Sequence, residues 1–198
     1  MTKPKQNAIN YRKRGLFYSN IGRYDEAESD YTESINAEPT ANNYNERGLF
    51  YFNIDEYELA REDFKMAAEL SPEAVYLYNV GYMDYLDFDY ASAIDYFNQS
   101  LAVDNDYTSA RTYRGLAYYR SGEYALCIAD YTVLLAQDPT DDTASNNRGL
   151  CHDSLGQYDL AIADFTRAIE NRGVQVVELH NRGATLRRAE RYEDSLAD

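Results

Sequence analysis

The fold is decided by the 34 residues from Thr108 to Asp141, TSARTYRGLAYYRSGEYALCIADYTVLLAQDPTD, because their pattern recurs along the whole chain. If Gly115 is taken as position 8 of a repeat, its equivalents follow one another at steps of 33 or 34 residues, at Gly15, Gly48, Gly81, Gly149 and Gly183. A fixed period of this length is typical of a protein built from stacked copies of one small structural unit. The sequence therefore predicts six consecutive repeats.

The same period aligns other residue types. Position 17 is tyrosine in all six repeats, position 20 is small in all six, position 24 is aromatic wherever the chain reaches it, and position 32 is proline in three repeats. Small residues at positions 8 and 20 let two helices approach closely, while the aromatic side chains fill the space around them. Glycine at position 15 suits the end of the first helix, and proline at position 32 ends the second.

A 34-residue repeat with these positions resembles the tetratricopeptide repeat. The resemblance covers nearly the whole chain and implies an all-α fold, a right-handed superhelical solenoid of antiparallel helix pairs. We expect a disordered tail at 1–7 and a single solenoid domain over 8–198. Its repeats would lie at about 8–40, 41–73, 74–107, 108–141, 142–175 and 176–198, the last one incomplete.

The composition narrows the class of partner. The formal net charge of −15 argues against binding to the phosphates of nucleic acids and against an anionic membrane surface. The first residues lack the apolar segment of a signal peptide, and no stretch approaches the length of a membrane span. We therefore expect a cytoplasmic location. Cys127 and Cys151 occupy buried packing positions of adjacent repeats, so we expect two free thiols rather than a disulfide or a metal pair.

One correlation between repeats indicates a contact. Position 7 is arginine and position 23 is aspartate in repeats one, two, four, five and six, whereas repeat three replaces both together with Val80 and Tyr96. Paired replacement favours an ion pair between the two helices of a repeat. The expected pairs are Arg14 with Asp30, Arg47 with Asp63, Arg114 with Asp130 and Arg148 with Asp164. The alternative is a row of arginines that binds acidic ligands.

Asp84 is an anomaly, because it occupies position 11, where repeats one, two and four have a packed tyrosine. A buried carboxylate without a partner is costly. Asp84 therefore either finds a donor, for example Arg111 or a tyrosine hydroxyl of the neighbouring repeat, or lies on a rotated helix.

The sequence indicates no chemistry of its own. The two histidines have no recognisable catalytic partners, and the spacings typical of metal ligands are absent. All but one of the ten glycines occupy positions 8 or 15, which leaves none for a phosphate-binding loop. We expect no catalytic residues, no metal and no cofactor.

The resemblance also implies where a partner binds, since in this family the first helix of each repeat lines the inner, concave wall. The expected partner-binding residues are Asn45, Leu49, Phe52, Tyr78, Asn79, Tyr82, Tyr85, Thr112, Leu116, Tyr119, Asn146 and Leu150. Exposed aromatic side chains suit a bound segment, and asparagines suit the backbone of an extended peptide. The leucines could instead pack between neighbouring first helices.

The sequence favours a non-catalytic scaffold that binds a peptide or helix of a partner protein. Family members that grip acidic C-terminal tails use a basic set that is absent here, because Arg12 is followed by Leu16 at position 9 and Asn79 stands in repeat three. Repeat three has no lysine or arginine, which favours a ligand with apolar or aromatic anchors and flanking basic residues. A solvated acidic outer face is the alternative explanation of the charge. The alternative functions are a structural spacer, self-association through the C-terminal end, and an accessory domain of a larger protein.

Overall fold

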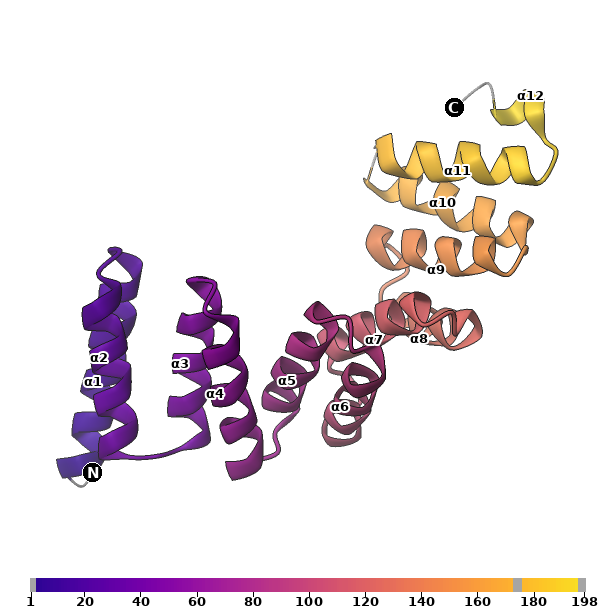
Figure 1. Ribbon diagram of the computed structural model, residues 1–198. Helices are drawn as coiled ribbons and strands as arrows, with labels where there is room; N and C mark the ends of the chain where they lie inside the picture. The colour runs from indigo at the N-terminus through magenta and orange to yellow at the C-terminus, as the bar shows by residue number, and fades with distance from the viewer. Residues whose placement is uncertain (1–2, 173–175, 196–198) are drawn as a thin grey trace. The chain divides into compact units, whose positions relative to one another are not determined.

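The computed structural model describes residues 3–172 and 176–195, and every regular element in this part of the chain is an α-helix (Figure 1). The helices are α1 (Lys3–Asn20), α2 (Tyr24–Ala37), α3 (Ala41–Asn53), α4 (Tyr57–Leu70), α5 (Ala74–Leu86), α6 (Tyr90–Val103), α7 (Thr108–Arg120), α8 (Tyr124–Gln137), α9 (Asp142–Ser154), α10 (Tyr158–Arg172), α11 (Val176–Arg188) and α12 (Tyr192–Ser195). Each even-numbered helix begins at a tyrosine of position 17. The predicted all-α fold of helix pairs is confirmed.

The start of α1 corrects one expectation. The helix begins at Lys3, inside the segment 1–7 that was expected to be disordered. Pro4 does not prevent this, because an N–H group in the first turn of a helix has no intrahelical acceptor and proline already has a helical φ angle. Residues 1 and 2 lie outside the described residues.

The turn inside each repeat depends on one backbone conformation. Position 15 has a positive φ in all six repeats, as glycine at Gly22, Gly122 and Gly156 and as another residue at Asp55, Phe88 and Glu190. This conformation ends the first helix and starts the second after two residues. Phe88 has φ 64° and a side chain that is 76% exposed, which is unusual because bulky residues rarely adopt a left-handed backbone.

The chain divides into two compact units, which we call the N-terminal unit (Met1–Asp87 with Gln99–Asn105) and the C-terminal unit (Phe88–Asn98 with Asp106–Asp198). In both units the position 8 glycine lies against the position 24 ring. A Cβ atom added to Gly48 would lie 2.8 Å from the ring of Phe64, and one added to Gly149 would lie 2.7 Å from that of Phe165. At these two glycines the helix pair therefore packs too closely for a Cβ atom unless the ring shifts.

The predicted arginine–aspartate pairs are present in both units. In each, Nε and Nη2 of the arginine donate to the two carboxylate oxygens of the aspartate, as in Arg47 with Asp63 at 2.7 and 2.9 Å. The same arrangement joins Arg14 to Asp30, Arg114 to Asp130 and Arg148 to Asp164. The aspartates are all buried. The prediction that these arginines form ion pairs between the two helices of a repeat is therefore confirmed, and the alternative of a row of arginines that binds acidic ligands is not supported.

These arginines also connect one repeat to the next. The remaining nitrogen, Nη1, donates to position 25 of the preceding repeat, so that Arg47 reaches Thr32 at 3.1 Å and Arg148 reaches Thr132 at 3.2 Å. Arg114 reaches Asn98 in the same way, and Arg182 reaches Thr166. One guanidinium thus holds three helices together, which the sequence comparison within single repeats did not predict.

Asp84 has a hydrogen-bond donor, which is the first of the two alternatives predicted for it. It is buried, and Nη1 of Arg61 on α4 donates to its carboxylate at 2.7 Å. Nη2 of the same arginine donates to the main-chain carbonyl of Met83 and to Asp87. The donor thus belongs to the preceding repeat, where Arg61 stands at position 21.

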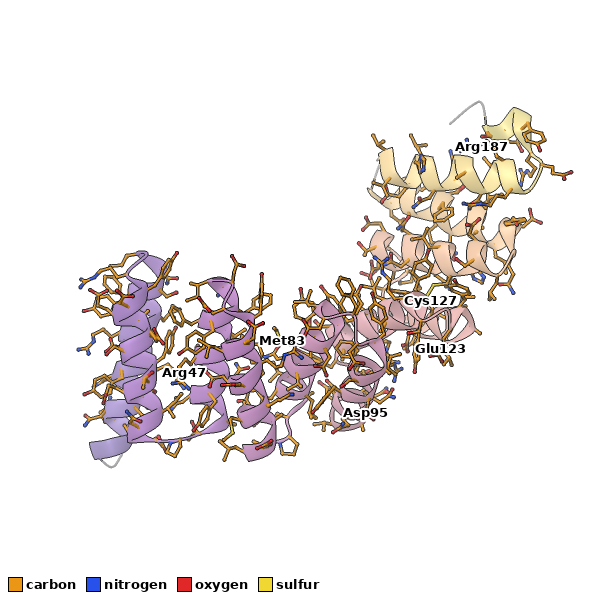
Figure 2. The ribbon with its side chains drawn as sticks, in the orientation of Figure 1. Arg47, Met83, Asp95, Glu123, Cys127 and Arg187 are labelled. Carbon is orange, nitrogen blue, oxygen red and sulfur yellow. A yellow bond between two sulfur atoms is a disulfide. The ribbon has the colours of Figure 1, made fainter. Side chains whose placement is uncertain are left out.

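The two cysteines correct a second expectation. Cys127 on α8 and Cys151 on α9 form a disulfide, with their Cα atoms 6.3 Å apart (Figure 2). The prediction of free thiols is wrong because positions 20 and 10 of adjacent repeats, although buried, face each other directly in the C-terminal unit.

Within the residues that the structure describes, no helix is long and apolar enough to span a membrane.

Candidate partner-binding surfaces

The N-terminal unit presents a group of aromatic rings, two on α5, one on α3 and one at the start of α4. Phe52 of α3 lies 5.8 Å from Tyr82 of α5, measured between ring centroids, and Tyr82 stacks on Tyr78 at 5.9 Å. Tyr57, at the start of α4, meets the other side of Phe52 edge-on at 5.6 Å. All four side chains are partly exposed. We call Phe52, Tyr57, Tyr78 and Tyr82 the aromatic cluster.

A carboxylate lies at the end of this cluster, and the sequence analysis did not identify it. The hydroxyl of Tyr57 donates to Oδ1 of Asp55 at 2.6 Å, and this hydrogen bond raises the pKa of Tyr57 above its usual value. The left-handed backbone of Asp55 places it in the tight turn just before α4. The sequence could have indicated this carboxylate, because Asp55 at position 15 lies two residues before the tyrosine at position 17.

The asparagines of the N-terminal unit do not lie where a peptide could reach them easily. Asn45 and Asn79 are buried, with 6% and 8% of their surfaces exposed, and Nδ2 of Asn79 donates to Oδ1 of Asn45 at 2.7 Å. Buried amides require hydrogen-bond partners, and these two satisfy each other. Their hydrogen bond joins the first helices of repeats two and three. This arrangement differs from the expectation that these amides bind the backbone of an extended peptide.

The apolar residues of position 9 differ from one another in exposure. Leu49 is 39% exposed, whereas Leu116 and Leu150 are partly buried. Tyr85 is also partly buried. Leu49 is thus exposed on α3, whereas the two leucines of the C-terminal unit contribute in part to packing.

The C-terminal unit repeats part of this arrangement. Tyr119 of α7 lies 5.7 Å from Tyr124 of α8, at the positions that Phe52 and Tyr57 occupy in repeat two. The main-chain carbonyl of Thr112 accepts a hydrogen bond from the hydroxyl of Tyr131 at 3.1 Å. Asn146 accepts one from Asn181 at 3.0 Å, so asparagine again joins neighbouring first helices.

The described residues contain no group of histidine, cysteine, aspartate and glutamate side chains suited to hold a metal ion. Nδ1 of His152 lies 2.6 Å from the side-chain oxygen of Gln157, and its Nε2 lies 3.9 Å from Asp164. His152 therefore takes part in the packing of α9 against α10.

Models of the tetratricopeptide repeat match residues 10–40, 41–73, 89–142 and 143–172. The comparison with curated proteins gives no match. Among solved structures, the chain is similar to MamA, with 24% identity over 84% of this chain and 92% of that one and a TM-score of 0.77.

Two further solved structures show the same fold. YrrB, described as a tetratricopeptide repeat protein with an unusual peptide-binding site, shares 20% identity over 89% of this chain and 92% of its own, with a TM-score of 0.77. PilF of Pseudomonas aeruginosa shares 16% identity over 99% and 90%, with a TM-score of 0.79. Because the repeat models match well over half of the sequence and the helix pairs follow the same period, the chain belongs to the tetratricopeptide repeat family.

Proposed function

We propose that the protein is a non-catalytic scaffold and that the aromatic cluster of its N-terminal unit binds a peptide or helix of a partner protein. The observation that carries the proposal is the contact between Phe52, Tyr78 and Tyr82, three partly exposed rings from two successive first helices. Aromatic side chains that remain partly exposed at the surface are typical of residues that dominate binding energy in interfaces. The tetratricopeptide fold supports a protein-interaction role in general.

The chemistry of the cluster favours a basic or aromatic ligand. Ring faces attract cations, and Asp55 adds a carboxylate at the end of the cluster beside Tyr57. The paired amides of Asn45 and Asn79 supply rigidity between α3 and α5 rather than direct contacts. We therefore expect a segment with an apolar or aromatic anchor and a neighbouring lysine or arginine. The peptide-binding site named for YrrB supports a peptide ligand, although the likeness to that protein establishes the fold alone.

The sequence predicted one binding surface across repeats two to four, whereas we propose the part of it that lies in the N-terminal unit as the main binding surface. Thr112, Leu116, Tyr119, Asn146 and Leu150 belong to the C-terminal unit, and we propose them as a second, weaker contact surface. Tyr119 and Leu116 would be its apolar contacts, since both pack against the core and remain partly accessible.

The experiment measures the binding of labelled peptides by fluorescence anisotropy at low and high salt. A peptide with tryptophan or phenylalanine flanked by lysine should bind, and its acidic counterpart should not. Tyr82→Ala should weaken binding by about tenfold or more. Tyr24→Ala is the matched control, since Tyr24 is half exposed but lies outside the cluster. The proposal fails if acidic peptides bind equally well or if Tyr82→Ala and Tyr24→Ala behave alike.

A second candidate is self-association through the C-terminal end, which a specific observation favours. Val176 and Val177 at the start of α11 are 83% and 61% exposed. Light scattering of the chain against concentration tests this candidate, and a Val176→Asp, Val177→Asp double variant should remain monomeric if these side chains mediate the contact.

The compartment remains a prediction. The first residues, without a signal-peptide pattern, and the lack of a membrane-length apolar stretch led us to expect the cytoplasm. The Cys127–Cys151 disulfide instead favours an oxidising compartment, because thiols are kept reduced in the cytosol. Thiol titration of protein purified with alkylation during lysis separates the two.

A further inference from the structure

Two first helices of the N-terminal unit, α1 and α3, carry the same four residues at the same positions of their repeats. The pairs are Asn10 and Asn43, Arg14 and Arg47, Phe17 and Phe50, and Tyr18 and Tyr51, at positions 3, 7, 10 and 11. In α3 each of these residues has a known task, which makes the repeat its own reference for α1.

In α3 the four residues hold the preceding helix, α2. Nδ2 of Asn43 donates to the main-chain carbonyl of Glu38 at 2.7 Å, and Nη1 of Arg47 donates to Thr32 at 3.1 Å. The ring of Phe50 lies 5.4 Å from that of Tyr31.

The fourth contact involves a charge. The hydroxyl of Tyr51 donates to the carboxylate of Glu28 at 2.9 Å. Two of the four contacts thus reach polar or acidic side chains of α2, one reaches its backbone end, and one is aromatic.

In α1 three of the corresponding residues, Asn10, Arg14 and Phe17, are exposed, and Tyr18 is partly buried with the guanidinium of Arg23 4.7 Å from its ring centroid. Phe17 is 57% exposed, whereas Phe50 is 2% exposed. The side chain of Arg14 is 55% exposed, against 19% for Arg47. Arg14 binds Asp30 through Nε and Nη2, and its Nη1 takes no part in this pair. In Arg47 the same atom donates to Thr32. α1 therefore carries the α2-binding set of α3 on a face where Phe17 and much of Arg14 are open to solvent.

The segment that carries this face differs in charge from the rest of the protein. The first 23 residues contain six basic and no acidic residues, in a chain with 34 acidic residues and a net charge of −15. The helix that α3 binds is the opposite, since α2 contains five acidic and no basic residues. The residues of this face, and the basic character of the segment that carries them, thus suit an acidic amphipathic helix.

We propose that the outer face of α1, formed by Asn10, Arg14, Phe17 and Tyr18, docks an acidic amphipathic helix of another protein. The helix presents an aromatic ring to Phe17, a carboxylate to Tyr18 and a hydroxyl to Arg14, as α2 does to α3. Among the described helices, α2, α4, α8 and α10 each already pack against the first helix that follows them, and we assign the occupant to another protein. This surface is distinct from the aromatic cluster and takes a ligand of opposite charge.

The probe is a capped, labelled peptide with the sequence of residues 24–38, titrated into the full chain at low salt. Phe17→Ala should raise its Kd by about tenfold or more, since the ring is the central apolar contact. Leu16→Ala is the matched control, because Leu16 is the neighbouring residue of the same helix and is 50% exposed; it should change Kd less than about twofold. Both variants keep exposed positions and should melt at the temperature of the parent chain.

A peptide carrying Glu28→Lys should bind more weakly than the parent peptide, because the carboxylate meets Tyr18 and a basic surface. Amide chemical shifts should change around Asn10, Arg14 and Phe17 and not around Phe50, which excludes exchange of the peptide with the chain's own α2.

Several results overturn the proposal. One is the absence of binding at about 0.5 mM peptide, a concentration at which even a weak docking contact is populated. Another is loss of peptide binding in Tyr82→Ala but not in Phe17→Ala, which assigns the peptide to the aromatic cluster. A dimer in light scattering that Phe17→Ala dissolves assigns the face to a second copy. Binding to phosphatidylglycerol vesicles that depends on Phe17 assigns it to a lipid surface.

Discussion

Replacing Arg47 by alanine tests the most regular interaction of the structure. Its guanidinium makes two hydrogen bonds to Asp63 within its own repeat and one to Thr32 of the preceding repeat. Asp63 is 4% exposed, and the side chain of Arg47 is 19% exposed. Arg47→Ala removes all three hydrogen bonds and leaves a carboxylate that water reaches poorly.

The magnitude follows from the balance between burial and attraction. Burial raises the pKa of Asp63 above its usual value even though the hydrogen bonds of Arg47 lower it, while the same bonds raise the pKa of Arg47. Burial thus outweighs the attraction for Asp63, whereas the attraction outweighs burial for Arg47, so the intact pair contributes little net stability, but loss of its cation leaves Asp63 with its whole burial penalty. We expect a loss of about 3 kcal/mol, at the lower end for a broken buried pair.

Urea unfolding followed by far-UV circular dichroism measures the loss. Without Arg47 the folded state favours protonated Asp63 more strongly, so the deficit should shrink as the pH is lowered from neutral towards 4. Arg14→Ala should cost clearly less, because Arg14 is 55% exposed and water can replace it at Asp30. An Arg47→Met, Asp63→Leu double variant should regain most of the stability. A loss below about 0.5 kcal/mol for Arg47→Ala would refute the reasoning.

Three further predictions concern packing, backbone and titration. Gly149→Ala should destabilise the protein by about 1–2 kcal/mol, because the added Cβ lies 2.7 Å from Phe165, whereas Gly15→Ala, with nearest atoms at 3.3 Å, should be nearly neutral in the same thermal melts. Phe88→Gly should raise the free energy of unfolding by about 1 kcal/mol by relieving a left-handed φ, and no gain in a urea titration would mean that the ring contact with the following tyrosine offsets the strain. Burial, with a hydrogen bond to Glu28, raises the pKa of Tyr51 to about 12. The stability that this tyrosine contributes should therefore be complete below pH 10 and fall as the pH rises from about 10 to 12, less steeply in Tyr51→Phe; equal slopes would contradict this.

Much of the fold could be predicted from the sequence because six repeats show which residue types recur at each position. The small residue at position 8 and the ring at position 24 recur together, and Gly149 does lie against Phe165. The arginine–aspartate pairs were predictable for the same reason, since repeat three lost both members at once. The left-handed turn was recognisable at Gly22 but not at Phe88, where only the period indicates it.

The rest depended on which neighbour a side chain meets, and spacing within one repeat does not give this. Asn45 and Asn79 stand at different positions, 5 and 6, so nothing in the alignment of repeats connects them, yet they share a buried hydrogen bond. Cys127 and Cys151 likewise belong to different repeats and face each other across α8 and α9. Arg61 reaches Asp84 from the preceding repeat. Each of these contacts joins one repeat to the next.

The pair of helices α1 and α3 shows why residue type alone does not determine a role. Phe17 and Phe50 occupy the same position and have the same chemistry, but one covers a neighbouring helix and the other faces solvent. The exposed set retains the full pattern of the buried one, including the asparagine and the tyrosine that bind no described helix through this face. An outer face that only needed to remain soluble would gain from polar residues at these positions. The retained set is therefore better explained by a helix that binds there than by solubility.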